Sequence, residues 1–316
     1  MKPPVSKTKL IFVNVAANNN EGKKRWERIE KQVVASLLPA IEIVKYKPPF
    51  DFAPDIRRFL AANEEGYIIS SGGDGSLNVL LNTLLPLMGE SRQRIGIGAI
   101  GIGSSNDFHK PFNRKLEGIP LRIDSHTSAV DIGQVDYTVD AKKWHRKYFL
   151  INASIGLIAN ANELFNKGDF IIDRLKNRFL NTTILYTALK TIATHRNMMG
   201  ALIQENGHKE RVPLTNLSII KNRHVSGEFM YDQKMEADNG LLGLNYCYDL
   251  NRIGILQALS DLKRGRFSGK PKRVSTYIKS VEIELDKIGS LETDGEITAI
   301  KKAKISVLPK AIQLMN

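Results

Sequence analysis

The stretch YIISSGGDGSLNVLLNTLL, residues 67–85, joins a short apolar run to a pattern with helical spacing through three glycines and an aspartate. Glycine is favoured where the backbone takes a positive φ or approaches a ligand closely, and successive amides in such a turn form a concavity that binds anions. A helix opening near Ser76 adds its unpaired N–H groups and the positive end of its dipole. The stretch therefore predicts a strand, a phosphate-binding loop and a helix.

Asp74 is the residue of this loop that a bare phosphate would repel. A carboxylate beside phosphates becomes favourable when a magnesium ion, or the ordered water around one, lies between them. The alternative is a plain strand-to-helix turn in which Asp74 or Ser76 caps the helix. We interpret the loop as the site of a metal-bound nucleotide, although no GK[ST] sequence of a Walker loop follows it. The residues assigned to the loop are Gly72, Gly73, Asp74, Gly75 and Ser76.

Strand and helix patterns alternate along the first third of the chain. Apolar strand patterns cover residues 9–15, 41–46 and 67–70, and amphipathic helical patterns cover residues 23–38 and 54–62. Because each strand is followed by a helix, this order predicts a parallel sheet covered by helices.

Strand patterns outnumber helical patterns in the rest of the chain. Strand-like segments lie at residues 147–151, 201–204, 214–220, 242–248, 280–285 and 303–307. Helical patterns lie at residues 159–165, 182–194 and 253–262. The change predicts a boundary near residue 130, between an α/β domain at residues 1–130 and a β-rich domain at residues 131–305.

The charge balance of the 316-residue chain indicates phosphate-rich partners. Lys and Arg number 46 against 33 Asp and Glu, and the formal charge of +13 attracts nucleic acid, anionic membranes and nucleotides alike. The most basic stretch, KRGRFSGKPKR at residues 263–273, is either a solvated loop or a contact with anionic headgroups. The single cysteine, Cys247, excludes an internal disulfide, and no apolar run reaches the ~18 residues of a spanning helix. These features predict a cytoplasmic protein.

A second motif follows the hexapeptide GIGAIG at residues 96–101. The hexapeptide fits the dinucleotide pattern G-x-G-x-x-G, but that pattern has to open a helix, and the glycine–isoleucine alternation is typical of a narrow buried strand. The next residues, IGSSNDFHK at 102–110, place small hydroxyl residues, an amide and Asp107 at the end of that strand, where open α/β sheets bind ligands. Taken alone, SSND is typical of a helix N-cap. We expect Asp74 and Asp107 to converge on one site for magnesium and phosphate.

Together, GGDGS at 72–76 and SSNDF at 104–108 resemble the nucleotide motifs of the diacylglycerol kinase catalytic family, which includes sphingosine and ceramide kinases and whose second motif commonly reads LGTxNDF. NAD kinases and phosphofructokinases share the GGDG loop but lack the NDF element, so the pair is more specific than either part. The resemblance implies ATP and magnesium as cofactors, with Asp74 and Asp107 at the catalytic magnesium ion. The further nucleotide contacts that it implies are Asn14, Asn78, Ser104, Ser105, Asn106 and Asp107.

The resemblance extends over most of the chain. Asn14 resembles the asparagine of the family's N-P-x-[SA]-G loop, although Val15 replaces the proline. Asp131 and Asn152 match segments at the start of the second domain. The fold that this implies is an α/β domain with a mainly parallel sheet, a β-sandwich domain, and a tail at residues 306–316 that packs on the first domain.

A weaker match is MEADNGLLGL at residues 235–244. It is similar to a segment that binds a structural magnesium ion in some bacterial members through two acids and a carbonyl group. The ligands implied here are Glu236 and the Leu241 carbonyl, with Asp238 nearby and Asn239 in the place of the second acid, and this loss of charge weakens a site for a hard cation. The alternative is an Asn-Gly hairpin turn.

The stretch SLETDGEITAI, residues 290–300, places Asp294 and Gly295 between two strand-like runs, which alone predicts a type I′ hairpin turn. In the diacylglycerol kinase family a DGE sequence stands at this place, and its glutamate is the proposed base for the lipid hydroxyl. The resemblance therefore assigns Glu296 as the candidate base and Asp294 as the alternate, which act with Asp74. Phosphoryl transfer needs alignment, neutralised charge and a proton acceptor, and we expect the cleft between the two domains to close on ATP.

The sequence thus predicts an ATP- and magnesium-dependent lipid kinase that phosphorylates the hydroxyl of diacylglycerol or a related lipid. We expect a cytoplasmic enzyme that associates peripherally with an anionic membrane surface and has no nucleic-acid partner. The sequence does not decide whether it forms a homodimer. Two alternatives also stay open. One is a kinase of a soluble acceptor, as in NAD kinases or phosphofructokinases, and the other is a non-catalytic basic protein on the same fold that binds nucleic acid or membranes.

Overall fold

The computed structural model describes residues 7–37, 40–89, 94–167, 180–205 and 207–316. The chain divides into two compact units, one made of Met1–Asp131 with Pro309–Asn316 and the other of Ile132–Leu308. Two strands run from one unit into the other, β7 (Thr127–Thr138) and β17 (Glu296–Met315). In the described part of the chain, no helix has both the length and the apolar character needed to cross a bilayer.

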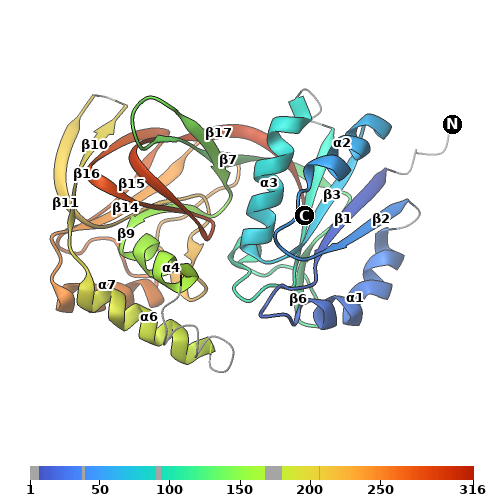
Figure 1. Ribbon diagram of the computed structural model, residues 1–316, viewed down its shortest axis with the longest axis horizontal. Helices are drawn as coiled ribbons and strands as arrows, with labels where there is room; N and C mark the ends of the chain where they lie inside the picture. The colour runs from blue at the N-terminus through green and yellow to red at the C-terminus, as the bar shows by residue number, and fades with distance from the viewer. Residues whose placement is uncertain (1–6, 38–39, 90–93, 168–179, 206) are drawn as a thin grey trace. The chain divides into compact units, whose positions relative to one another are not determined.

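The first unit is built on a parallel sheet, drawn in blue to cyan in Figure 1. Its strands are β1 (Thr8–Asn14), β2 (Ile41–Tyr46), β3 (Gly66–Gly72) and β4 (Ile95–Gly101), in the order β2-β1-β3-β4. The end of β17 continues the sheet parallel to β4, with Gln313 beside Gly96. The short antiparallel strands are β5 (Lys115–Leu116) and β6 (Ile119–Arg122). Every residue of β3 and β4 is buried, as expected for parallel strands covered on both faces.

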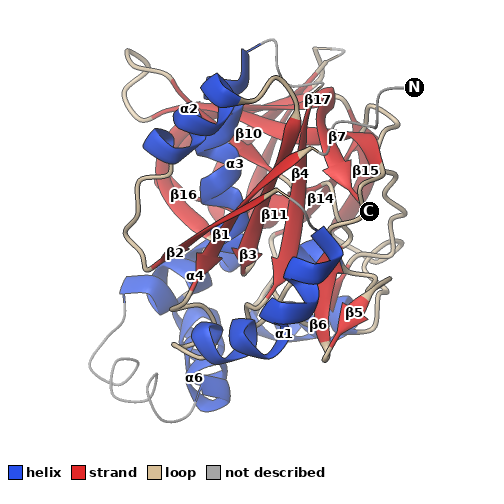
Figure 2. Cartoon of the chain, turned by 90° about the vertical axis from the view of Figure 1, so that its right-hand side faces the viewer, coloured by secondary structure: helices blue, strands red, loops and turns tan. Residues whose placement is uncertain are grey.

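Three helices cover this sheet. Figure 2 shows α1 (Gly22–Leu37) on one side of the strands, and α2 (Ala53–Ala62) and α3 (Asp74–Met88) on the other. The alternation of side chains along β1 explains the two layers, because Ile11 packs in one cluster with Trp26 of α1. Phe12, the next residue, points the other way and meets Phe52 at the start of α2 with ring centroids 4.9 Å apart.

The second unit is mainly antiparallel β-structure. Its strands are β8 (His145–Phe149), β9 (Asn152–Gly156), β10 (Met198–Gln204), β11 (Lys209–Ile220), β12 (His224–Val225), β13 (Phe229–Met230), β14 (Leu242–Tyr248), β15 (Arg273–Ile278) and β16 (Ser280–Thr293). They pair in the order β15-β14-β11-β10-β16-β17, and β9 pairs with both β11 and β16. A core of buried aliphatic and aromatic side chains lies among these strands, with Leu217, Leu244 and Ile283 fully buried. Its helices are α4 (Leu157–Lys167), α6 (Leu180–Thr194) and α7 (Arg252–Lys263).

The predicted fold class, an α/β unit with a mainly parallel sheet and a second β-rich unit, is confirmed. The predicted helix at residues 23–38 is α1, although residue 38 itself lies outside the described residues. Strands β7, β9 and β15 were not predicted.

Candidate functional site

The predicted nucleotide residues gather at the carboxyl ends of β1, β3 and β4. In the order β2-β1-β3-β4 the connections change direction between β1 and β3, and such a switch point is where open α/β sheets bind ligands. Asn14, the last residue of β1, donates from Nδ2 to Ser76 Oγ at 2.9 Å. Its Oδ1 accepts the N–H of Ala16 at 3.0 Å, so the buried Asn14 links its own loop to the loop after β3.

Asp74 joins the two motifs. It is the first residue of α3, and its carboxylate accepts the N–H of Asp107 at 2.9 Å and the N–H of Phe108 at 3.1 Å. These N–H groups open a short 3₁₀ helix, η2 (Asp107–His109), which follows Asn106 in the left-handed region at φ 50°. Asp74 therefore caps the neighbouring helix rather than α3, whose N-cap is Gly73, and the two motifs meet through the Asp74 carboxylate and the backbone of Asp107.

The glycines of the loop serve close approach rather than positive φ. Gly72, Gly73 and Gly75 are absent from the positive-φ residues of the described chain, so a positive φ is not the reason for these glycines. A Cβ atom on Gly103 would lie 2.3 Å from the Cα of Gly73, and the Gly103 N–H donates to the Gly72 carbonyl at 3.0 Å. The glycines let the two strand-end loops touch backbone to backbone.

Basic side chains that the sequence analysis missed surround this junction. Lys110 Nζ lies 2.7 Å from Asp107 Oδ1, and both side chains are largely buried. Arg25 of α1 donates to the Gly103 carbonyl, and the Arg122 guanidinium lies 5.3 Å from the centre of the Phe108 ring. Lys23 and Lys24 at the start of α1 are exposed and pair with Glu27 and Glu21. The only signal in the sequence was the basic character of residues flanking the motifs.

Burial and positive charge set the protonation of this site. Burial, followed by the charge of Arg122, lowers the pKa of His109 to about 3, so its imidazole is neutral at ordinary pH. Burial also lowers the pKa of Arg122. The imidazole therefore adds no charge to this junction, whose basic groups are Arg25, Lys110 and Arg122.

A small cavity of about 10 Å³ lies beneath the loop, lined by residues that include Gly73, Asp74, Asn106 and His109. This volume holds at most about one water molecule. Asn106 Nδ2 donates to the Gly101 and Gly103 carbonyls at 3.0 Å each, whereas its buried Oδ1 has no hydrogen-bond partner among the described residues. The cavity is therefore too small to hold a nucleotide.

Three further nucleotide residues were predicted at this end of the sheet. Asn78 is buried on α3, Ser104 is exposed and Ser105 is partly exposed in the loop before Asn106. The two serines are therefore accessible to solvent, whereas the Asn78 side chain is not.

The predicted DGE sequence of the second unit forms a tight turn. Asp294 and Gly295 have φ values of 47° and 97°, as a type I′ turn requires. The buried Asp294 carboxylate accepts three backbone N–H groups, from Leu150 at 2.7 Å and from Ile151 and Asn152 at 2.9 Å. Asp294 is thus an anchor of the turn.

Glu296 follows this turn as the first residue of β17 and is exposed. Burial lowers the pKa of Lys147, and the charge of Glu296 opposes that shift. An exposed carboxylate on a fixed turn is available to a substrate.

Glu292 was missed by the sequence analysis. It is buried at 2% exposure, and it accepts the N–H of Gly295 and a hydrogen bond of 2.7 Å from Asn152 Nδ2. Burial, with the charge of Asp294 as a further cause, raises the pKa of Glu292 to about 8. Glu292 and Asp294 therefore hold the turn from both sides, and the three acids in LETDGE were the only signal of this in the sequence.

The segment with Glu236 and Leu241 does not form the Asn-Gly hairpin turn that was the alternative to a magnesium site. Asn239 does not take the positive φ that a type I′ turn needs, so the hairpin alternative was wrong. Lys221 Nζ lies 3.2 Å from the Leu241 carbonyl, which was a predicted ligand of the structural magnesium, and 2.8 Å from the Glu236 carbonyl.

The basic stretch at 263–273 is partly structural. Lys263, Lys272 and Arg273 pair with acids, and Phe267 is buried against Tyr231 with ring centroids 5.0 Å apart. The remaining cations, Arg264, Arg266 and Lys270, are exposed and make no ion pair with the described residues.

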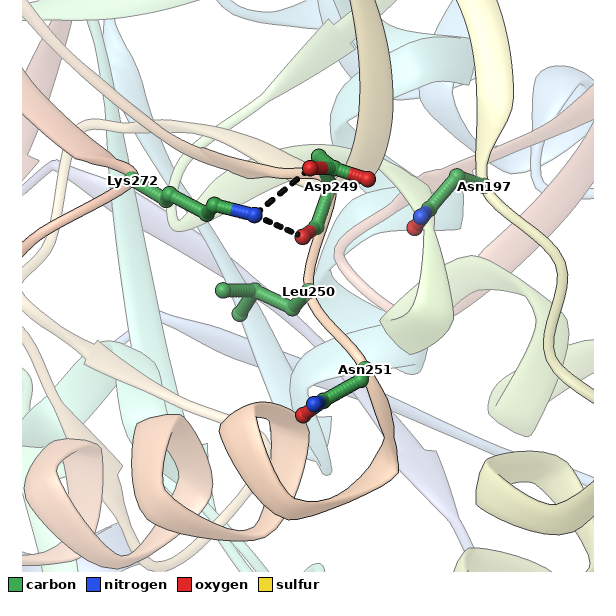
Figure 3. A pocket seen from close by; sticks show the side chains of 5 residues that line it. All are labelled: Asn197, Asp249, Leu250, Asn251 and Lys272. Atoms are coloured by element: carbon green, nitrogen blue, oxygen red, sulfur yellow. Dashed lines mark hydrogen bonds and ion pairs between the residues drawn. The ribbon is translucent and has the colours of Figure 1, made fainter.

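An open hollow of about 500 Å³ in the second unit contains none of the predicted site residues. Figure 3 shows its lining, which is Asn197, Asp249, Leu250, Asn251 and Lys272. Lys272 is bonded to Asp249, and the Asn251 side chain caps α7 through Gly254 N–H at 2.8 Å. Because these polar groups stabilise the fold, the hollow is no candidate for the chemistry.

The comparisons with known proteins identify the family. Residues 8–135 match the model of the diacylglycerol kinase catalytic domain, and residues 152–316 match that of the YegS C-terminal NAD kinase beta sandwich-like domain. A diacylglycerol kinase of Staphylococcus epidermidis is 30% identical over 258 residues, which cover 80% of this chain and 75% of that protein. The chain belongs to the diacylglycerol kinase family. Membership confirms the predicted resemblance and makes the chain a phosphotransferase with an alcohol acceptor, for which the kinase family implies ATP as the phosphate donor.

Other relatives agree with this family. A lipid kinase YegS-like protein of Shewanella frigidimarina is 23% identical over 300 residues, 93% of this chain and 91% of that protein. A solved structure from Bacillus anthracis assigned to the diacylglycerol kinases has a TM-score of 0.72 at 20% identity, covering 99% of this chain and 98% of its own. Yeast NADH kinase complexed with NADH has a TM-score of 0.51 at 8% identity, covering 100% and 88%. At these identities the two structures show the fold alone.

Proposed function

We propose that the chain is a lipid kinase that transfers the γ-phosphate of ATP to the hydroxyl of diacylglycerol or a related lipid at a membrane surface. The observation that carries the proposal is the bonding of Asp74 to the N–H groups of Asp107 and Phe108. This contact unites the glycine loop with the NDF element, and the pair of motifs favours the lipid kinases over the soluble-acceptor kinases that share the loop alone.

The phosphates of ATP are proposed to lie over the start of α3. The first N–H groups of a helix have no partner within it, so Gly75 and Ser76 can donate to phosphate oxygens. Arg25 and Lys110 add positive charge at the adjoining loop. No side chain has to form a covalent bond with the phosphate, because catalysis of phosphoryl transfer is chiefly positioning and charge stabilisation.

Asp74 and Asp107 are the residues that would hold a magnesium ion. In the described chain no cluster of three or more His, Cys, Asp or Glu side chains could hold a metal ion by itself. Magnesium commonly takes only one or two carboxylates and completes its shell with phosphate oxygens and water, so a pair of acids fits it. When bound, the ion neutralises charge on the phosphates and fixes their geometry.

Glu296 is proposed as the base that accepts the proton of the lipid hydroxyl. An alcohol is a far weaker acid than a glutamic acid, so Glu296 accepts the proton late, as the bond from oxygen to phosphorus forms. Asp294 is the weaker candidate because its carboxylate already accepts three backbone N–H groups. Such a base contributes about 10²- to 10⁴-fold to the rate.

The membrane contact is proposed to lie on α7 and the residues after it. Ile253 and Leu256 are 67% and 50% exposed, and their spacing of three puts them on one face of the helix. Arg264, Arg266 and Lys270 follow directly and are exposed. Exposed apolar side chains beside cations suit the interface of an anionic bilayer.

The test is transfer of labelled phosphate from ATP to vesicles that contain diacylglycerol. We expect transfer by the wild-type protein and a loss of about 10²- to 10⁴-fold for Glu296→Gln. The matched control is Glu284→Gln, which changes an exposed glutamate on the neighbouring strand β16 and should leave the rate unchanged.

Two alternatives predict other outcomes in the same assay. Transfer only to NAD or a hexose phosphate, and none to lipid, would support a kinase of a soluble acceptor. Binding of vesicles or nucleic acid without turnover on any acceptor would support a non-catalytic protein. Equal rates for wild type and Glu296→Gln would remove Glu296 as the base.

A further inference from the structure

The side chain of Lys221 lies at the centre of the loop that resembles a magnesium-binding segment. Lys221 directly follows β11 and is buried at 8% exposure. Its Nζ lies 2.8 Å from the carbonyl oxygen of Glu236 and 3.2 Å from that of Leu241. An ammonium group donates up to three hydrogen bonds, so one cation holds both ends of the loop at residues 236–241.

These residues do not fit a magnesium ion. The Leu241 carbonyl accepts from an ammonium at hydrogen-bond distance, whereas a magnesium ligand lies about 2.0–2.1 Å from the metal. Asn239, in the place of the second acid, turns its Oδ1 to the N–H of Leu241 at 3.1 Å.

We propose that the Lys221 ammonium replaces a structural metal ion in this chain, so that the loop at residues 236–241 is held without magnesium. One positively charged group of the protein itself donates hydrogen bonds to both carbonyl oxygens. That also explains why Asn239 is tolerated, because a monovalent cation needs fewer acidic partners than magnesium does.

The same lysine is tied to the turn that carries Glu296. The N–H groups of Lys221 and Asn222 both donate to the Ile151 carbonyl, at 2.8 and 3.1 Å. The N–H of Ile151 in turn donates to Asp294 Oδ1 at 2.9 Å. The loop, Lys221 and the turn at Asp294 thus form one hydrogen-bonded series inside the second unit.

The experiment is thermal unfolding of the full chain without nucleotide, in EDTA and in magnesium chloride. We expect the wild-type midpoint to differ by less than about 1 °C between the two, and the Lys221→Met midpoint to fall by about 4–8 °C in both. Lys234→Met is the matched control, because Lys234 is an exposed lysine of the same region, and its midpoint should stay within about 1 °C of wild type.

The measurement is repeated with Asp107→Asn, to distinguish an effect of magnesium bound at Asp74 and Asp107 from an effect of magnesium bound at the loop of residues 236–241. A rise of the wild-type midpoint by several degrees in magnesium, kept in Asp107→Asn and lost in Glu236→Ala, would overturn the inference. A Lys221→Met midpoint equal to that of wild type would also overturn it. If Lys221→Met does not fold, the unfolding midpoints of wild type, Asp107→Asn and Glu236→Ala with and without magnesium still test the inference. The inference concerns the fold, so it stands or falls independently of the lipid kinase activity.

Discussion

Asp74 and Asp294 are carboxylates that hold distant backbone segments, one in each unit. Asp74 accepts N–H groups of residues more than thirty positions away, and Asp294 accepts three from Leu150, Ile151 and Asn152. Hydrogen bonds of backbone N–H groups to a carboxylate are stronger than neutral ones, and leaving such donors buried without a partner is costly. Alanine at either position would therefore weaken the fold together with any chemistry.

Glu292 makes stability depend on pH in a direction opposite to that of most acids. Its pKa of about 8 in the folded protein lies above its unfolded value, so the folded state binds the extra proton. The folded protein therefore loses stability as the pH rises from the ordinary glutamate pKa of 4.5 toward about 8. We expect Glu292→Gln to lack this loss, and to gain about 2–3 kcal/mol relative to wild type between about pH 5.5 and about pH 8.

Urea unfolding of both proteins at the two pH values measures the effect of Glu292. Glu284→Gln, an exposed change on the same strand, should show the pH dependence of wild type. Parallel pH curves for wild type and Glu292→Gln would contradict the assignment.

The two loops at the ends of β3 and β4 are packed through their glycines. A methyl group on Gly103 would meet the Gly73 backbone at 2.3 Å, and neither main chain can move without breaking the bond from Gly103 N–H to the Gly72 carbonyl. We expect Gly103→Ala to lower the unfolding midpoint by about 4–8 °C and to weaken binding of an ATP analogue about tenfold or more.

The control for Gly103 is Gly254→Ala on α7. A methyl group there meets first the Asn251 side chain at 3.3 Å, and the change should leave nucleotide binding unaltered. Normal nucleotide affinity in Gly103→Ala would show that the two loops do not act as one site.

The sequence predicted those elements whose pattern is local. β1 and β3 are apolar runs, so the parallel sheet followed from periodicity, whereas the candidate site followed from the two motifs and their resemblance to the diacylglycerol kinase family. β9 reads NASIG, with small residues and no alternation, and it becomes a strand through pairing with β11 and β16. The bonds of Asp294 and Lys221 could not be predicted, because they join segments that pattern cannot relate. The hydrogen bond from Asn152 to Glu292 could not be predicted for the same reason.

The formal charge of +13 acts on the whole molecule, whereas the proposed membrane contact is local. We expect Arg264→Glu, Arg266→Glu and Lys270→Glu in one variant to lower binding to anionic vesicles by about tenfold or more, since each basic residue contributes about 1 kcal/mol near such a surface. Binding by wild type should weaken as NaCl rises from about 0.05 M to about 0.5 M.

Vesicle co-sedimentation measures this binding. A variant with the same change in net charge, Lys31→Glu with Lys47→Glu and Arg57→Glu, alters three exposed cations of the first unit. Equal losses in the two variants would show that net charge alone attracts the membrane, and a flat response to salt would remove the electrostatic contact.

The proposed lipid kinase activity requires that the loop at Gly72–Ser76 and the motif at Asp107 bind a magnesium nucleotide together. Calorimetric titration of a non-hydrolysable ATP analogue, with and without magnesium, tests it most directly. We expect micromolar to millimolar binding that needs magnesium in wild type and falls about tenfold or more in Asp107→Asn. The exposed change Glu64→Gln should leave it unaltered. Absence of binding in the presence of magnesium, or equal affinity in wild type and Asp107→Asn, would contradict a shared nucleotide site at these two motifs.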